Sequence, residues 1–270
     1  MLFRSNLGLA VVCFPLLDLM AAWMKRLAPD RAGPVDPGAP VYLDRAALET
    51  PVVALAGASR EALRMADMLE EILRSLRSAF EKPDPYKISE TRRLEDTLDR
   101  LNGAIKAYVT GLDPDAMSEA DHRRVLEVLT FATNLEQAGD LVDRNLLGVI
   151  AKKLKRGIDF SEAGRAELLA LIDRLIANVR TAASIFMSGD ARAARLLVDE
   201  KAAFREALTQ ATKGHFDRLR AGRKDSAATS SMHLDALRDL KRVNAHLVSG
   251  AAYPVLEIAH AQEERIEAAE

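Results

Sequence analysis

Apolar side chains recur along most of the chain at spacings of three and four residues, which is the period of an α-helix with one buried face. The clearest run lies in residues 89–109, and its repeating positions are Leu94, Leu98, Leu101, Ile105 and Tyr108. Residues 118–155 carry a second run, made of Val125, Leu129, Ala132, Leu135, Val142, Leu146 and Val149. The pattern predicts an all-α protein whose helices pack along narrow apolar seams.

Proline, glycine and short polar runs divide the chain into six long helical stretches. We expect these helices over residues 45–80, 89–109, 118–155, 161–188, 191–219 and 231–270, with a kink at Pro254. Long helices joined by short loops pack antiparallel in bundles. The sequence therefore predicts two antiparallel three-helix bundles, one over residues 45–157 and one over residues 158–270. Gly103 and Gly139 lie inside predicted helices, where they favour close helix approach.

Residues 1–28 form a separate apolar segment. Leu7–Met24 contains about 18 residues with Asp18 as its one charge, which is near the lower limit for crossing a hydrocarbon core of roughly 30 Å. Trp23 and the basic residues after it suit a membrane interface. We expect a membrane-associated hydrophobic helix here. A signal peptide, an amphipathic surface helix and a helix packed on other membrane helices are the alternatives. Residues 29–44, rich in proline and glycine, are expected to be a linker.

Charge and cysteine content exclude several classes of protein. The chain has 38 Lys and Arg against 40 Asp and Glu, without the basic surplus of a nucleic-acid-binding protein. A single cysteine, Cys13, excludes an internal disulfide framework and a thiolate zinc site. The sequence has no nucleophile motif, no glycine-rich phosphate loop and no HExxH motif. We therefore expect no enzymatic activity and no nucleic-acid partner.

Acidic residues at helical spacing are the candidate site. In the segment NLEQAGDLVDR they stand at i, i+4 and i+7, within about 60° on one helix face. Similar rows occur in the second and sixth predicted helices. The rows of the third and sixth helices are offset by 99 residues, which suggests an internal duplication. The candidate metal ligands are Glu95, Asp99, Glu136, Asp140, Asp143, Asp235 and Asp239.

Stacked carboxylates repel one another, so these rows need compensation. A divalent or iron ion could provide it, because hard cations prefer carboxylate oxygens. Arginine or lysine from a facing helix would serve equally, and a solvated acidic stripe is the third interpretation. His246 falls on the row of Asp235 and Asp239, as a metal ligand or as a hydrogen-bonding residue of the bundle core.

Two segments resemble a known family. ETRRLEDTLDRLNGAIKAYVTGL and RVLEVLTFATNLEQAGDLVDR resemble the second and third helices of the PhoU family. That resemblance implies two three-helix bundles related by duplication, with Glu/Asp-x-x-x-Asp motifs that form metal clusters in some members. The pairs that match the motif are Glu95 with Asp99, Glu136 with Asp140, and Asp235 with Asp239.

A longer resemblance covers almost the whole chain. FPLLDLMAAW, YLDRAALETPVVALAGASREALRMADML and SMHLDALRDLKRVNAHLVSGAAYPVLE, in this order, look like bacterial sodium/phosphate cotransporter-family proteins from their last membrane helix onward. The resemblance implies a regulatory domain on the cytoplasmic side of the inner or plasma membrane that controls phosphate uptake. Its partner would be the membrane domain of a phosphate transporter. A stand-alone phosphate-signalling adaptor that touches a phosphate-sensing kinase, and a purely structural scaffold, are the alternatives. Exposed bundle faces are compatible with a homodimer.

The sequence departs from these families in three respects. The inverted repeats of a transport domain are missing, so this chain is not expected to form a phosphate pathway itself. Glu200 is followed four residues later by Phe204, which weakens the case for a metal site in the second bundle. Arg242 stands in the row of Asp239, where an ion pair would neutralise the carboxylate.

Overall fold

A computed structural model describes residues 38–267 of the chain and the side chains of residues 38–261. The described residues form helices and contain no strand, so the predicted all-α class is confirmed. The hydrophobic segment over residues 1–28 and most of the linker lie outside the described residues. Within the described range, no helix is both long enough and apolar enough to span a membrane.

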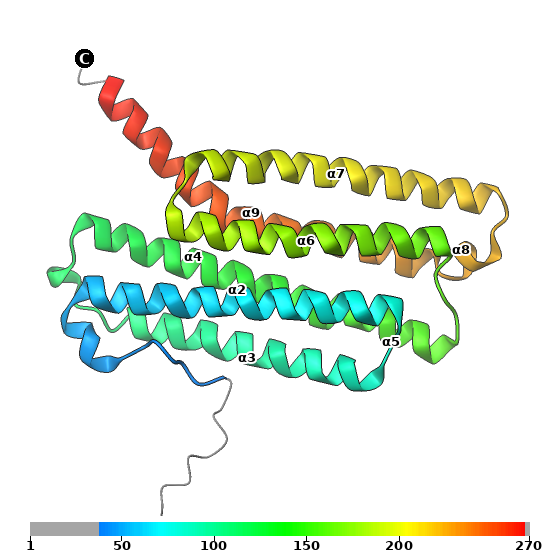
Figure 1. Ribbon diagram of the computed structural model, residues 1–270, viewed down its shortest axis with the longest axis horizontal. Helices are drawn as coiled ribbons and strands as arrows, with labels where there is room; N and C mark the ends of the chain where they lie inside the picture. The colour runs from blue at the N-terminus through cyan, green and yellow to red at the C-terminus, as the bar shows by residue number, and fades with distance from the viewer. Residues whose placement is uncertain (1–37, 268–270) are drawn as a thin grey trace, which may run out of the picture. The chain divides into compact units, whose positions relative to one another are not determined.

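Six long helical segments run back and forth along the molecule (Figure 1). The third of them is divided by a π-helical turn. The elements are η1 (Arg45–Glu49), α2 (Pro51–Glu81), α3 (Pro85–Val109), η2 (Pro114–Ala116), α4 (Glu119–Leu141), the π turn η3 (Val142–Leu146), α5 (Leu147–Arg156), α6 (Glu162–Ser188), α7 (Ala191–Arg220), α8 (Lys224–Ala228) and α9 (Ser230–Glu267).

The prolines set the starts of the first two helices differently from the sequence prediction. The first helix begins at Pro51 and not at Arg45, because residues 45–49 form a 3-10 turn capped by the side chain of Asp44. The second begins at Pro85, four residues before the expected start, with Asp84 capping the backbone of Tyr86. Proline suits the first turn of a helix, since its missing N–H would have no partner there.

The other differences concern the later helices. The expected single helix over residues 118–155 is interrupted by the π turn, and the expected break at residues 222–231 contains the short α8. Helix α9 continues through Pro254 to Glu267, and its C-terminal part departs from the direction of the rest of the helix (Figure 1). Gly157 and Gly189 end α5 and α6 in the left-handed conformation, at φ 63° and 64°.

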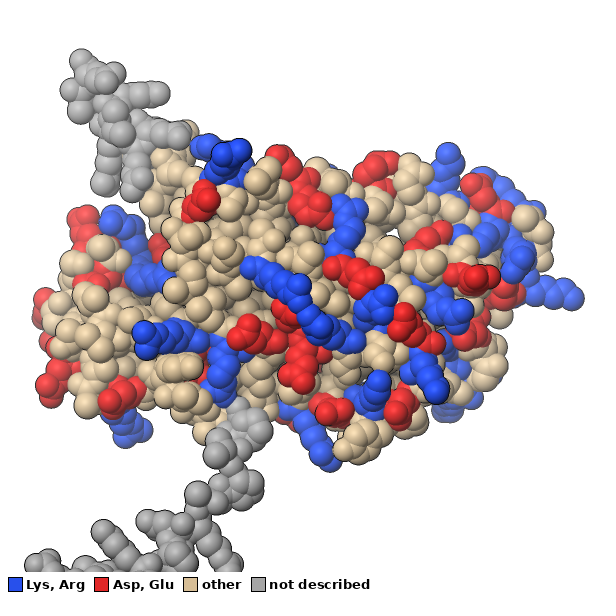
Figure 2. All heavy atoms as spheres, viewed as in Figure 1, with Lys and Arg blue, Asp and Glu red and all other residues tan. Residues whose placement is uncertain are grey.

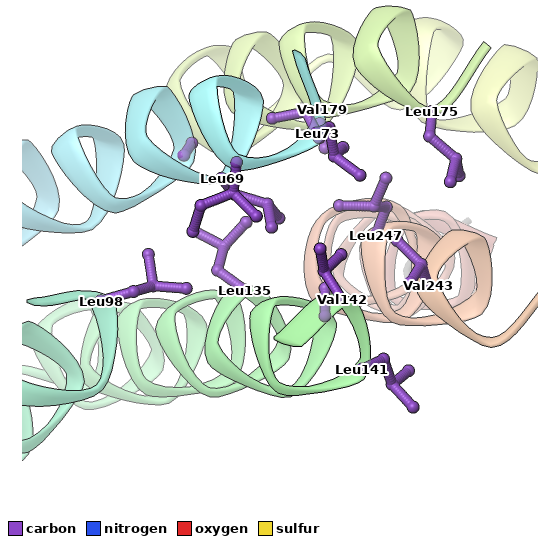
Figure 3. Packing of buried hydrophobic residues seen from close by; sticks show 14 of the residues in the cluster. Leu69, Leu73, Leu98, Leu135, Leu141, Val142, Leu175, Val179, Val243 and Leu247 are labelled. Atoms are coloured by element: carbon purple, nitrogen blue, oxygen red, sulfur yellow. The ribbon is translucent and has the colours of Figure 1, made fainter. Parts of the chain in front are cut away.

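One continuous apolar core holds the long helices together. Helices α2, α3 and α4 contact one another, as do α6, α7 and α9, but α4 also lies against α9 and α2 against α6. Figure 3 shows Leu69 and Leu135 between α2 and α4, and Leu73 facing Val179 between α2 and α6. Residues 40–270 consequently form one compact unit, with no separation at Gly157.

Candidate functional site: the acidic seam between α3 and α4

A close approach of two helices places the acidic residues. A Cβ atom at Gly139 would lie 2.6 Å from Leu98 Cδ2 and 3.7 Å from Glu95 Cγ, so the backbone of α4 lies directly against side chains of α3. The next residue along the chain is Asp140, which therefore comes beside Glu95. The prediction of close approach is confirmed at Gly139, whereas nothing lies within 4 Å of a Cβ atom at Gly103.

Glu95 is the most perturbed carboxyl group on this seam. Its residue is 8% exposed, and its pKa is raised to about 7. Burial is the largest cause, followed by the negative charges of Asp140 and Asp143 and a hydrogen bond with the side chain of Asp140. The charged groups with the largest effect on this pKa are all carboxylates. Glu95 therefore gains or loses its proton near neutral pH.

Glu136 extends the seam toward the middle of α3. Burial raises its pKa, and the charges of Asp140 and Asp99 raise it further, while Lys106 and Arg144 oppose them. The structure thus brings together the five acidic residues predicted in this half of the chain: Glu95, Asp99, Glu136, Asp140 and Asp143. We define these five residues as the acidic seam.

Two exposed arginines partly neutralise the seam. Arg144 Nη2 lies 2.9 Å from Asp140 Oδ1, and Arg92 Nε lies 3.0 Å from Asp143 Oδ1. The Asp140–Arg144 spacing of i, i+4 is visible in the sequence as an ion-pair signal. The pair with Arg92 joins different helices, and it depends on the register of α3 against α4.

Asp143 lies in a π-helical turn that the sequence did not predict. The predicted acidic row assumed 100° per residue from Glu136 to Asp143, but Val142–Leu146 is π-helical and accommodates more residues per turn. Asp143 lies within this turn, where it pairs with Arg92 of α3 and still acts on Glu95. Such turns are frequent at functional sites of other proteins.

The acidic row on α9 has a different environment. Asp239 is 1% exposed and pairs with Arg238 at 3.1 Å and with Arg242 at 3.3 Å. Asp235 also pairs with Arg238, at 2.9 Å. The predicted neutralisation by Arg242 is confirmed, and arginines of the same helix balance this row.

The position four residues after Glu200 does not supply a ligand either. Phe204 is buried in the core, and Glu200 pairs with Arg174 of α6 at 2.7 Å. His246 serves as a hydrogen-bonding residue, with Nδ1 3.0 Å from Asn134 Oδ1.

Metal binding needs several ligands at one point. Among the described residues, no three His, Cys, Asp or Glu side chains are grouped so that they could hold a metal ion. Carboxylate oxygens are suitable donors for hard cations, but Asp140 and Asp143 are turned toward arginines. A metal ion at this point would therefore need both aspartates to leave their arginines, and the seven predicted ligands stay a prediction.

The acidic seam lies in a segment that is similar to a known domain. Residues 62–144 match the PhoU domain. This chain contains a PhoU domain. The PhoU domain takes in most of α2, the whole of α3 and α4, and the start of the π turn, so the complete acidic seam is within it.

Curated relatives are similar over nearly the whole chain. The protein named "Putative inorganic phosphate export protein YjbB" from Salmonella typhimurium is 37% identical over 260 residues, which cover 96% of this chain and 48% of the relative. The protein of the same name from Escherichia coli K12 is 36% identical over 252 residues, covering 93% and 46%. The chain therefore spans about half the length of these relatives. No solved structure matches it.

Proposed function

We propose that this chain is a PhoU-like regulatory region that controls the movement of phosphate across a membrane. The observation that carries the proposal is the acidic seam within the PhoU domain, where the buried Glu95 titrates near neutral pH beside Asp140. Its similarity to the YjbB proteins, which are named for phosphate export, supports a role in phosphate transport.

The direction of transport is part of the proposal. The sequence resemblance implied a sodium/phosphate cotransporter and control of phosphate uptake. The name of the YjbB relatives favours export instead. We propose that the region acts on a membrane transport domain from the cytoplasmic side, and that it regulates phosphate release.

One end of the helical unit offers a surface for such a partner. Val52, Leu126 and Met187 are each more than half exposed there, at the start of α2, in the first half of α4 and at the end of α6. Arg124 lies among them, with its guanidinium 4.4 Å from the ring centroid of Phe186. Figure 2 shows a broad uncharged area over the neighbouring ends of α2 and α6, whereas charges of both signs are interspersed elsewhere on this face. Such an apolar surface favours a protein contact.

A cation in the acidic seam is a second part of the proposal. Binding there would require Arg144 and Arg92 to release Asp140 and Asp143, which would then be free to act with Glu95 as oxygen ligands. Metal analysis of the purified chain tests this part. Stoichiometric metal that disappears in a Glu136→Ala/Asp140→Ala variant would support it, and metal-free protein in both forms would refute it.

The function is tested by disrupting the gene in its own organism and following radioactive phosphate in both directions. We expect altered phosphate release, restored by the intact gene. Unchanged uptake and unchanged release would refute the proposal. Cross-linking in the same cells identifies the partner: a membrane transport domain is expected, whereas capture of a sensor kinase would favour the adaptor interpretation.

A further inference from the structure

A polar hollow lies at the contact between α4, the π turn and α9. Its volume is about 410 Å³. Six polar side chains line it: Gln137 and Asp140 from α4, Arg144 and Asn145 from the π turn, and Arg242 and His246 from α9. The hollow therefore joins residues of the PhoU domain to residues of the last helix.

The positive side chains of the hollow are held in place but remain accessible. Arg144 is anchored by Asp140 and Arg242 by Asp239, and more than half of each arginine side chain is exposed. A guanidinium has several N–H groups in a planar fork, so it can keep one carboxylate partner while it donates to an oxyanion. The amides of Gln137 and Asn145 add neutral donors to the same lining.

The hollow also contains hydrogen-bond acceptors. Asn134 Nδ2 donates to the backbone oxygen of Thr130 at 2.9 Å, which turns Asn134 Oδ1 toward His246 Nδ1. Nδ1 of His246 must then carry the hydrogen, so Nε2 of the neutral ring is an acceptor. Burial and the charge of Arg242 both lower the pKa of His246, which keeps the ring neutral. The carboxylate of Asp140 is a second acceptor in the lining.

We propose that this hollow binds inorganic phosphate in a hydrogen-bearing form and discriminates against sulfate. Arg144 and Arg242 would donate to the unprotonated oxygens, and Asp140 or His246 Nε2 would accept the P–O–H hydrogen. Phosphate carries at least one hydrogen at neutral pH, whereas sulfate carries none. A sulfate oxygen would therefore face these acceptors with no hydrogen between them, which leaves polar groups unpaired and repelling.

The position of Asp140 connects this hollow to the acidic seam. The same carboxylate lines the hollow, pairs with Arg144 and raises the pKa of Glu95. A phosphate that draws Arg144 toward itself would leave Asp140 less neutralised beside Glu95. This regulatory meaning rests on the proposed function, whereas the binding site rests on the lining of the hollow alone.

The test is titration calorimetry of the purified 270-residue chain with sodium phosphate and with sodium sulfate at neutral pH and equal ionic strength. We expect phosphate to bind and sulfate to bind at least roughly tenfold more weakly, since one unmatched polar contact has about that effect. Arg144→Met and Arg242→Met should each weaken phosphate binding roughly tenfold or more. Asp140→Asn should reduce the preference for phosphate over sulfate.

Arg238→Met is the matched control. Arg238 is an exposed arginine of α9 that also pairs with Asp239, but it does not line the hollow. Its loss should leave phosphate binding unchanged, and circular dichroism of each variant checks the fold. No phosphate binding by the unaltered chain at about 10 mM, equal affinity for phosphate and sulfate, or an equal loss in Arg238→Met would overturn the site.

Two further comparisons distinguish free phosphate from a lipid headgroup, and the binding site from the proposed function. Binding to vesicles of phosphatidylcholine with phosphatidic acid that needs Arg144 and Arg242, without binding of inorganic phosphate, would overturn free phosphate as the ligand and assign the hollow to a lipid headgroup. Specific phosphate binding in a chain whose gene disruption leaves phosphate fluxes unchanged would keep the site and refute the proposed function.

Discussion

Burial and three neighbouring carboxylates act in the same direction on Glu95, and all of them favour its protonated form. A carboxyl group with a pKa of about 7 changes charge under ordinary cellular conditions. Asp140 contributes to the raised pKa of Glu95, because the close approach of α3 and α4 at Gly139 brings the two carboxyl groups together. The charge of the acidic seam therefore depends on pH near neutrality.

Replacing Glu95 by Gln should stabilise the protein at high pH. A carboxyl pKa raised from 4.5 to about 7 means that the folded state binds more protons than the unfolded state over this interval. Stability is therefore lost as pH rises from about 4.5 to 7, and the penalty is complete above 7. We expect Glu95→Gln to gain about 1–3 kcal/mol in urea unfolding near pH 8 and little near pH 5.

Glu90→Gln is the matched control for this prediction, because Glu90 is an exposed glutamate of the same helix. It should change stability by less than about 0.5 kcal/mol at either pH. An equal gain at both pH values in Glu95→Gln would show that the carboxyl group is not perturbed as described.

The sequence indicated the acidic residues of the seam but not all of their partners. Helical spacing was sufficient to identify Glu136 and Asp140, since both lie in one continuous helix. Arg92 could not be assigned to Asp143, because their contact depends on how α3 and α4 pack and on the π turn. The arginines on α9 were easier to anticipate, since Arg242 follows Asp239 by three residues.

At the scale of helices, Gly139 sets the distance between α3 and α4. Alanine is a better helix former than glycine by about 1 kcal/mol. At Gly139, however, its methyl group would meet the fully buried side chain of Leu98, which would have to shift within the core. Overpacking of this kind costs about 1–3 kcal/mol.

Gly139→Ala should therefore lower the free energy of unfolding by about 1 kcal/mol, measured by urea denaturation. Gly103→Ala supplies the comparison on the facing helix, where a Cβ atom meets nothing within 4 Å. It should raise stability by up to about 1 kcal/mol. If both variants were stabilised, the close approach of α3 and α4 would be wrong.

A buried pair of histidines joins α7 to α9. The rings of His215 and His233 stack with centroids 4.8 Å apart, and both residues are buried. Glu167 faces His233 at 3.3 Å and pairs with Arg218 at 2.7 Å. Burial lowers the pKa of His215, the charges of His233 and Arg218 lower it further, and Glu167 opposes them.

Stability should accordingly fall as pH drops below the ordinary histidine pKa of 6.5, because the folded state disfavours the charged form of His215. We expect His215→Gln to show a flatter decline of stability between about pH 7.5 and 5.5. His122→Gln, at an exposed histidine of α4, should keep the original slope. A decline that is just as steep in His215→Gln would assign the pH dependence to other groups.

The ends of helices were predictable where a nearby glycine stops the helix. The helix ends expected at residues 155 and 188 lie at Arg156 and Ser188, each followed by a glycine in the left-handed conformation. The start at Pro85 is capped by Asp84, and the start at Pro51 follows a 3-10 turn; apolar periodicity alone reveals neither feature. The π turn at Val142–Leu146 has no clear sequence signal, since its residues continue the apolar pattern of a helix.

At the scale of the molecule, the apolar core crosses the boundary that the sequence suggested near Gly157. Val142 and Val243 lie where α4 meets α9 in Figure 3, and both are fully buried. The interfaces of α4 with α9 and of α2 with α6 are therefore part of the core and not a contact between finished domains. The sequence pattern predicted six long antiparallel helices but not the core that all of them share.

A fragment of residues 45–157 should therefore be unstable in isolation. It would expose the faces of α2 and α4 that are buried in the whole chain, and each buried leucine or valine left in water costs about 1.5–3 kcal/mol. We expect a broad, low-temperature melting transition by circular dichroism, in contrast to one cooperative transition for residues 40–270. A fragment that melted as cooperatively as the longer chain would restore the two-bundle division.

We propose that the acidic seam of the PhoU domain regulates phosphate transport. The most direct measurement is phosphate release from cells of the source organism that carry Glu95→Gln/Asp140→Asn, at protein levels equal to those of the unaltered strain. We expect altered phosphate release in this variant and normal phosphate release in the control Glu90→Gln. Release identical to that of the unaltered strain would contradict it.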